Sequence, residues 1–88
     1  MEDKPTLHSY KILLFAMLRE KAGDSIVVNL AQSEVTVQDL VAGCAAQFPQ
    51  LKPWLAHTKI AVNQAYATND MIVRPEDEIA FIPPVAGG

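Results

Sequence analysis

The residues best suited to chemistry are the last four of the sequence, Val85-Ala86-Gly87-Gly88. Because glycine lacks a Cβ atom, the diglycine can enter a slot that is too narrow for other side chains. When extended, the four residues reach about 13 Å, which is enough to carry a carboxylate into the cleft of another protein. The alternative interpretation of this segment is a frayed terminus without a function.

The other polar candidates have simpler structural interpretations. Cys44 lies on an apolar helical stripe, where a cysteine is usually a small buried hydrophobe. His57 has no Ser, Cys or Asp partner at a catalytic spacing, and a single cysteine gives no disulfide or metal framework. Arg19 and Glu20 are typical of surface residues in local ion pairs. We therefore expect no metal site and no catalytic group in the body of the chain.

Composition narrows the classes of function. The 88 residues, 50% of them hydrophobic, form a single domain with one modest core. Ten acidic and seven basic residues give a net charge of −3, and no basic stripe suits nucleic acid. No apolar segment is long enough to span a bilayer, and no signal core follows the N-terminus. These observations predict a cytoplasmic protein without a nucleic-acid or membrane partner.

Strands and one principal helix are predicted for the body of the chain. Thr36, with Asp39 three residues later, resembles a capping box that begins a helix over 37–48, which Pro49 ends. Gly43 inside this helix predicts close packing against a sheet. Runs of strand-forming residues predict five strands, the fourth of them short, over 10–17, 25–30, 58–63, 64–67 and 78–82.

The first predicted strand has two apolar faces. Alternation places Leu13, Phe15 and Met17 on one face, with Ile12, Leu14 and Ala16 on the other. If the first and last strands are neighbours, Ile82 joins Leu13 and Phe15, and one apolar face remains after the core is built. Ordinary core packing is the alternative for these residues.

Two proline-containing segments set the path of the chain before the last four residues. Pro75, in the second position of Arg74-Pro75-Glu76-Asp77, fixes a turn before the last strand. Pro83 and Pro84 stop the sheet hydrogen bonds and stiffen the chain as it leaves the sheet.

The order of elements, followed by a diglycine, resembles the ubiquitin-like β-grasp. Three segments are also similar to the small, sulfur-carrier subunits of molybdopterin synthase: Leu14-Phe15-Ala16 with Leu18-Arg19-Glu20, Val62-Asn63-Gln64, and the closing block Asp77 to Gly88. The resemblance spans Tyr10 to Gly88, although a hydroxyl residue is common in the family where Ala86 stands.

The fold that this resemblance implies is α+β. A mixed sheet of four to five strands packs on one main helix. We expect a flexible leader over 1–9, a β-grasp domain over 10–82, and an extended tail over 83–88 that ends in the flexible diglycine.

The resemblance implies a carrier that is not an enzyme on its own. A ubiquitin-activating-like adenylyltransferase would use ATP to adenylate the carboxylate of Gly88, and a sulfur donor protein would convert it to a thiocarboxylate. The large synthase subunit, in a heterotetramer with the carrier, would then use this sulfur on precursor Z in molybdenum cofactor biosynthesis. The chain alone would bind no cofactor.

The resemblance also implies which residues meet the partners. The tail residues Val85, Ala86, Gly87 and Gly88 would insert into the partner proteins. The partner-binding surface would comprise Phe15, Tyr66, Ile82, Pro83 and Pro84. Tyr66 is included on the resemblance alone, whereas Phe15 and Ile82 also follow from strand alternation.

Two other functions remain open. A sulfur carrier for thiamin or tRNA thiolation would use the same terminal chemistry with a different acceptor, although the Phe-Ile-Pro-Pro-Val segment argues against it. A ubiquitin-like interaction module or protein modifier would not use sulfur chemistry.

Overall fold

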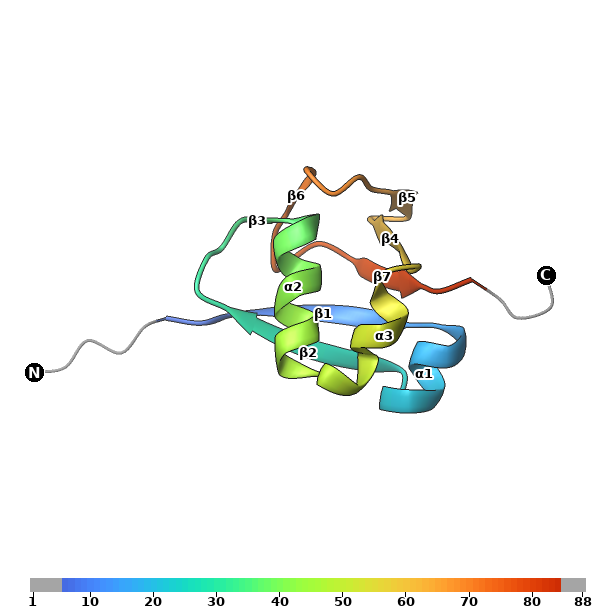
Figure 1. Cartoon of the computed structure of the whole chain (residues 1–88). Helices are drawn as coiled ribbons and strands as arrows, with labels where there is room; N and C mark the ends of the chain where they lie inside the picture. Colours follow the sequence, from blue (N-terminus) through green and yellow to red (C-terminus); the bar gives the residue numbers. More distant parts are fainter. Residues whose placement is uncertain (1–5, 85–88) are drawn as a thin grey trace, which may run out of the picture.

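A mixed five-stranded sheet forms one layer of the structure, a computed structural model that describes residues 6–84 (Figure 1). The strand order is β2-β1-β7-β4-β5; β1 and β7 are parallel, and the other neighbours are antiparallel. The predicted α+β arrangement with a mixed sheet is confirmed. The bounds are β1 (His8–Leu14), β2 (Ser25–Leu30), β4 (Lys59–Val62), β5 (Ala65–Tyr66) and β7 (Ile79–Ile82).

Helix α2 (Val37–Gln47) crosses one face of this sheet (Figure 1). Its N-cap is Thr36, whose Oγ1 accepts a hydrogen bond of 3.0 Å from the Asp39 N–H. The predicted helix start is therefore confirmed. The helix ends one residue earlier than predicted, because Pro49 begins the 3-10 helix η1 (Pro49–Leu51) and restricts the residue before it.

Gly43 lets α2 approach the sheet closely. A Cβ atom at this position would lie 2.8 Å from Leu30 Cδ2 and 3.3 Å from Val28 Cγ1, both on β2. The predicted close packing at Gly43 is confirmed. The core between helix and sheet consists of apolar side chains that include Tyr10, Ile12 and Leu14 of β1, Val37, Leu40 and Cys44 of α2, and Ile79 and Phe81 of β7.

The first strand ends earlier than its run of strand formers predicts. Phe15 keeps an extended backbone, with φ −127° and ψ 161°, but Ala16 has a left-handed φ of 50° and begins helix α1 (Ala16–Ala22). The prediction of a strand through Met17 is therefore wrong. The helix places Leu18 at 0% exposure in the core, which favours the early turn.

The first strand also begins earlier than predicted. His8 pairs with Leu30, Ser9 pairs with Asn29, and the Ser9 hydroxyl donates a 2.9 Å hydrogen bond to Asn29 Oδ1. His8 and Ser9, which we expected in the leader over 1–9, thus belong to β1, because the end of β2 supplies pairing partners for them.

A second, two-stranded sheet was not predicted. Strands β3 (Val35–Thr36) and β6 (Ile72–Val73) pair antiparallel, and Val35 and Val73 contribute to the core. The predicted turn after β6 is confirmed by the 3.0 Å hydrogen bond from the Asp77 N–H to the Arg74 carbonyl oxygen.

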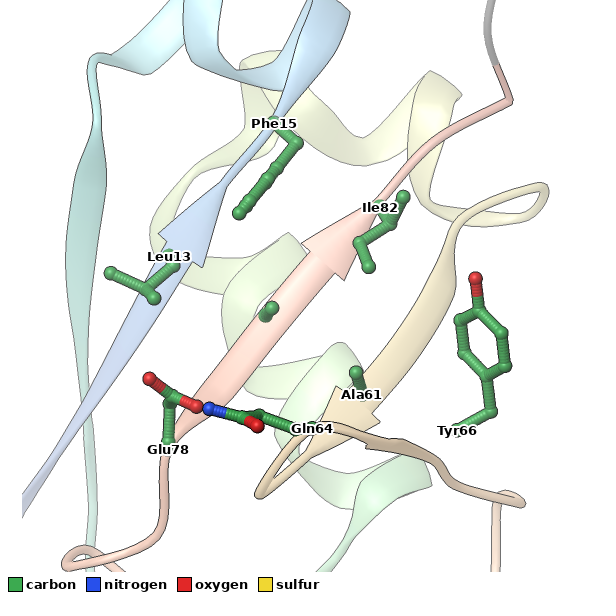
Figure 2. Close-up of a pocket in the computed structure, with 8 residues that line it drawn as sticks. Leu13, Phe15, Ala61, Gln64, Tyr66, Glu78 and Ile82 are labelled. Atoms are coloured by element: carbon green, nitrogen blue, oxygen red, sulfur yellow. The ribbon is translucent and has the colours of Figure 1, made fainter.

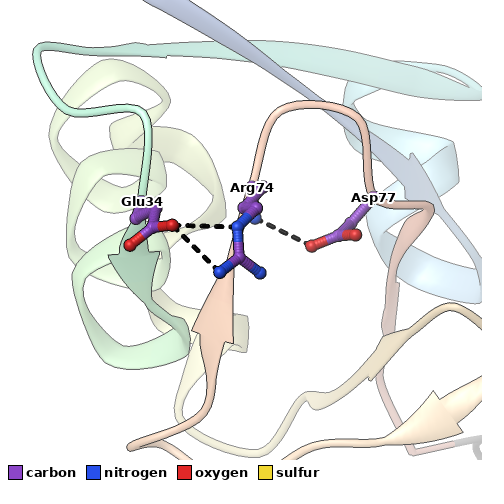
Figure 3. A network of polar contacts seen from close by, with 3 residues as sticks. All are labelled: Glu34, Arg74 and Asp77. Carbon is purple, nitrogen blue, oxygen red and sulfur yellow. Dashed lines mark hydrogen bonds and ion pairs between the residues drawn. The ribbon is translucent and has the colours of Figure 1, made fainter.

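Arg74 also ties this turn to the segment before β3 (Figure 3). Its Nη2 lies 2.9 Å from Glu34 Oε2, and its backbone N–H donates a 2.8 Å hydrogen bond to Asp77 Oδ2. The short helix α3 (Lys52–Leu55) completes the fold and, with α1, lies toward the end of the sheet where β7 ends (Figure 1).

Candidate functional site

Side chains that alternate with the core residues point to the sheet face opposite α2. Leu13 and Ala80 are neighbours in the parallel register of β1 and β7, and both are half-buried. By contrast, Ile12 and Phe81 on the core side of these strands are 0% exposed. This difference is typical of a sheet that is packed on one face. The predicted surplus apolar face is therefore present.

This face carries a hollow with a volume of about 370 Å³ (Figure 2). Phe15 is 39% exposed and Tyr66 is 70% exposed, whereas Ile82 is half-buried. The structure thus brings together three predicted partner-binding residues from separate segments of the chain. The residues that line the hollow include Leu13, Phe15, Tyr66, Glu78, Ala80 and Ile82, and we call this set the docking face.

The junction between β1 and α1 positions Phe15. The Leu14 N–H donates a 2.9 Å hydrogen bond to the Asp24 carbonyl oxygen, which fixes the chain immediately before Phe15. Ala16 follows in the left-handed region, which costs a non-glycine residue free energy. The reversal at Ala16 leaves Phe15 at the end of the strand, with its ring over the sheet.

A tight hairpin positions Tyr66. Asn63 and Gln64 both have positive φ, 52° and 71°, as the two central residues of a type I′ turn require. The Asn63 side chain joins this turn to the start of β7: its Nδ2 donates to Asp77 Oδ1 at 3.1 Å, and its Oδ1 accepts from the Glu78 N–H at 2.9 Å. Sequence reasoning missed this contact, although asparagine at a turn was its signal.

The docking face is apolar at its centre and polar at its edges. Glu78 and Gln64 lie at one end of the hollow (Figure 2). Lys59 Nζ lies 5.6 Å from the centroid of the Tyr66 ring, within the range of a cation–π contact. An apolar centre with a polar rim is the usual composition of a protein–protein interface.

Three predicted residues lie away from the docking face. Met17, which we expected beside Phe15, belongs to α1 and lines a different hollow, so that expectation is wrong. Pro83 is buried, Pro84 is exposed, and both line the same second hollow as Met17. The tail residues Val85, Ala86, Gly87 and Gly88, including the candidate reactive carboxylate, lie outside the described residues.

The remaining candidate side chains occupy structural positions. Cys44 is 0% exposed, and burial raises the pKa of its thiol to about 11, so the thiol is protonated at neutral pH. Arg19 Nε lies 2.7 Å from Asp24 Oδ1 in an exposed ion pair, as its surface interpretation predicted. Within residues 6–84, no three His, Cys, Asp or Glu side chains are grouped to hold a metal ion. Over the same range no helix is long and apolar enough to cross a membrane.

Fold and surface together define a class of protein: a β-grasp domain with an apolar sheet face beside the strand that leads to a diglycine. The chain belongs to the ThiS family, which it matches over residues 12–88.

Relatives in this family carry a more specific name. The chain is 40% identical over 84 residues to the molybdopterin synthase sulfur carrier subunit of Dictyostelium discoideum, a match that covers 92% of this chain and 98% of the relative. It is 36% identical over 78 residues to the corresponding subunit of Arabidopsis thaliana, covering 89% of this chain and 81% of the relative. The predicted resemblance to these carrier subunits is confirmed.

Solved structures share the fold. SAMP1, the small archaeal modifier protein 1 of Haloferax volcanii, superposes with a TM-score of 0.78 at 28% identity, covering 91% of this chain and 99% of that chain. The complex of subunits 1 and 2 of molybdopterin-converting factor from Helicobacter pylori contains a chain with a TM-score of 0.63 at 22% identity, covering 91% of this chain and 99% of that chain.

Proposed function

We propose that this chain is the sulfur carrier subunit of molybdopterin synthase and that Gly88 carries the sulfur as a thiocarboxylate. The meeting of Phe15, Tyr66 and Ile82 at one hollow, beside the strand that leads to the diglycine, is the observation that carries this proposal. Identity of 40% to a carrier of this kind over nearly the whole chain supports it.

The chemistry of a carboxylate explains why such a carrier needs an activating enzyme. The terminal carboxyl group has a reference pKa of about 3.3–3.7, so it is an anion at pH 7 and resists nucleophilic attack. Adenylation with ATP releases pyrophosphate and forms a mixed anhydride at Gly88. A hydrosulfide-level sulfur supplied by a donor protein then attacks the anhydride carbonyl, AMP leaves, and loss of a proton gives the thiocarboxylate.

In this proposal the domain supplies binding and reach, and the catalytic groups belong to its partners. The docking face holds first the activating adenylyltransferase and then the large synthase subunit, which passes the sulfur to precursor Z. Val85, Ala86 and Gly87 carry Gly88 into each partner. The heterotetramer and the cytoplasmic location remain predictions within the proposal.

Reconstitution tests this function. We expect the purified chain, incubated with the activating enzyme, ATP and a sulfur donor, to exchange one oxygen of Gly88 for sulfur, which intact-protein and C-terminal peptide mass spectrometry detect. Added large subunit and precursor Z should return the chain to its carboxylate form. A carboxylate that stays unmodified under these conditions would contradict the proposal.

A second candidate is a protein modifier, because SAMP1 shares 28% identity and the fold. A modifier would form an isopeptide bond from Gly88 to a lysine of another protein. Peptide mapping of the chain expressed in its host under sulfur-replete growth separates the two functions: free thiocarboxylate supports the carrier, and branched peptides that join the C-terminal segment of this chain to target lysines support the modifier. A carrier for thiamin or tRNA thiolation would form the thiocarboxylate but leave precursor Z unchanged.

A further inference from the structure

A second apolar hollow lies between α1 and α3, at the point where the chain leaves β7. Its volume is about 390 Å³, and Met17, Trp54, Pro83 and Pro84 contribute its apolar lining. Sequence reasoning missed it, because the hollow exists only once α1 and α3 have formed beside the end of β7. We call it the tail-base groove.

Trp54 is held in this groove by neighbouring groups. It is the single tryptophan of the sequence and is half-buried. Lys21 Nζ lies 5.1 Å from the centroid of the Trp54 ring. The backbone carbonyl oxygen of Trp54 accepts a 2.8 Å hydrogen bond from the Thr58 hydroxyl. A large aromatic surface fixed in this way is typical of the residues that anchor protein partners.

The tail-base groove and the docking face flank the same short segment. Ile82 lines the docking face, and the next residue, Pro83, lines the groove. Likewise, Phe15 lines the docking face, and the next residue, Ala16, lines the groove. Consecutive residues therefore connect the two hollows, on either side of the point where the chain leaves the sheet.

The length of the tail limits where a partner can sit. Four residues follow Pro84, and they reach about 13 Å when extended. A partner whose cleft takes in Gly88 must therefore place the entrance of that cleft close to Pro84, beside both hollows. Glu20 is exposed and is the carboxylate among the groove residues, whereas His57 also lines the groove and Lys21 lies over the Trp54 ring, so the negative charge of this lining is that of Glu20. An entrance with a cationic group would complement this charge.

We propose that the tail-base groove is a second contact site for the large synthase subunit, and that it receives an apolar side chain of that subunit beside a cationic group that faces Glu20. This inference rests on the proposed function. The docking face then holds one side of the partner and the groove holds the other, so that the tail enters the cleft from a fixed direction.

Fluorine NMR tests the occupancy directly. Incorporation of 5-fluorotryptophan gives a single resonance, from Trp54. We expect the large subunit to shift this resonance in proportion to the complex formed. Two results would overturn the proposal: a resonance unchanged by saturating large subunit, or a resonance that depends on the concentration of the free chain. The second result would indicate another copy of this chain as the occupant.

Matched substitutions test the contribution to binding. Met17→Gln should weaken binding of the large subunit about tenfold, as loss of an anchoring contact does. Met71→Gln is the control, because Met71 is 42% exposed and lies outside both hollows. Glu20→Gln should weaken binding and reduce its salt dependence, whereas Glu76→Gln should not. Binding by Met17→Gln and Glu20→Gln equal to that of the unaltered chain would overturn the inference.

A substitution in the docking face distinguishes a failure of this inference from a failure of the proposed function. If Phe15→Ala weakens binding while Met17→Gln and Glu20→Gln do not, the groove is not a contact site but the proposed function stands. If the unaltered chain fails to bind the large subunit, the proposed function itself fails.

Discussion

Phe15 is the residue that best separates the folding of this domain from the binding that we propose for it. Its backbone follows β1 directly and caps α1, yet 39% of the residue remains exposed at the hollow that Ile82 also lines. Phe81, one residue before Ile82, is 0% exposed and belongs wholly to the core. The two phenylalanines therefore provide a matched pair for separating binding from stability.

We predict that Phe15→Ala weakens binding to the large subunit by about tenfold or more, as expected for an interface anchor. The free energy of unfolding should fall by less than about 1.5 kcal/mol, because part of the ring is already in water. Phe81→Ala should instead cost about 3–5 kcal/mol of stability. Titration calorimetry and urea unfolding measure the two effects. Unchanged affinity with a large loss of stability would place Phe15 in the core.

Cys44 gives a prediction on pH. Burial raises the pKa of its thiol in the folded chain from 9.0 to about 11, so the unfolded chain loses this proton first as the pH rises. The contribution to stability is fully present below pH 9 and is lost as the pH rises toward about 11. Urea unfolding at several pH values should show a smaller alkaline loss in Cys44→Ala than in the unaltered chain. If the free energy of unfolding fell equally with pH in Cys44→Ala and in the unaltered chain, the raised pKa of Cys44 would be contradicted.

At the scale of elements, local signals predicted most of the sheet and its main helix. The Thr36 cap, the apolar period of α2 and the turn at Arg74 depend on residues close in sequence, and all three appear in the structure. The docking face was predictable at Phe15 and Ile82, because strand alternation assigns side chains to faces.

Other elements had no local signal. Val35–Thr36 and Ile72–Val73 are two-residue strands, too short for a period, and their pairing joins distant parts of the chain. The early end of β1 depends on the left-handed backbone of Ala16, which its side chain does not favour. The tail-base groove requires α1, α3 and β7 to meet, and only the tertiary structure determines this.

The edge of the sheet at β2 is protected by a side chain of α2. The Asn29 N–H donates to Gln47 Oε1 at 3.1 Å, and Gln47 Nε2 donates to the Asn29 carbonyl oxygen at 2.8 Å. The carboxamide of Gln47 thus occupies the donor and the acceptor that a further strand would use. Such protection limits pairing between the edges of two molecules.

We predict that Gln47→Ala lowers the free energy of unfolding by about 1 kcal/mol, because two hydrogen bonds to the edge strand are lost. Amide exchange at Asn29 should accelerate, and self-association should increase at high concentration. Gln38→Ala, at an exposed position of the same helix, is the control. Unchanged exchange at Asn29 in Gln47→Ala would contradict this role.

At the scale of the whole molecule, folding and the proposed sulfur transfer assign different roles to different parts of the chain. The described core is complete by Phe81, and Gly88 follows it outside the described residues. Deletion of Gly88 should therefore leave the unfolding midpoint unchanged but abolish sulfur transfer. Unfolding measurements and the reconstituted synthase assay test the two halves of this prediction. Retained transfer would refute the proposed role of Gly88.

The place of β7 in the sheet has a consequence for how the protein is made. β7 is the last strand in sequence, but it lies between β1 and β4 and supplies Ala80 and Ile82 to the docking face. During synthesis the sheet can close only after Ile82 has left the ribosome, because its central strand is the last to appear. A nascent or truncated chain that lacks β7 therefore has no docking face. If the docking face binds the partners as we propose, the order of synthesis keeps unfinished chains from occupying the activating enzyme and the large subunit.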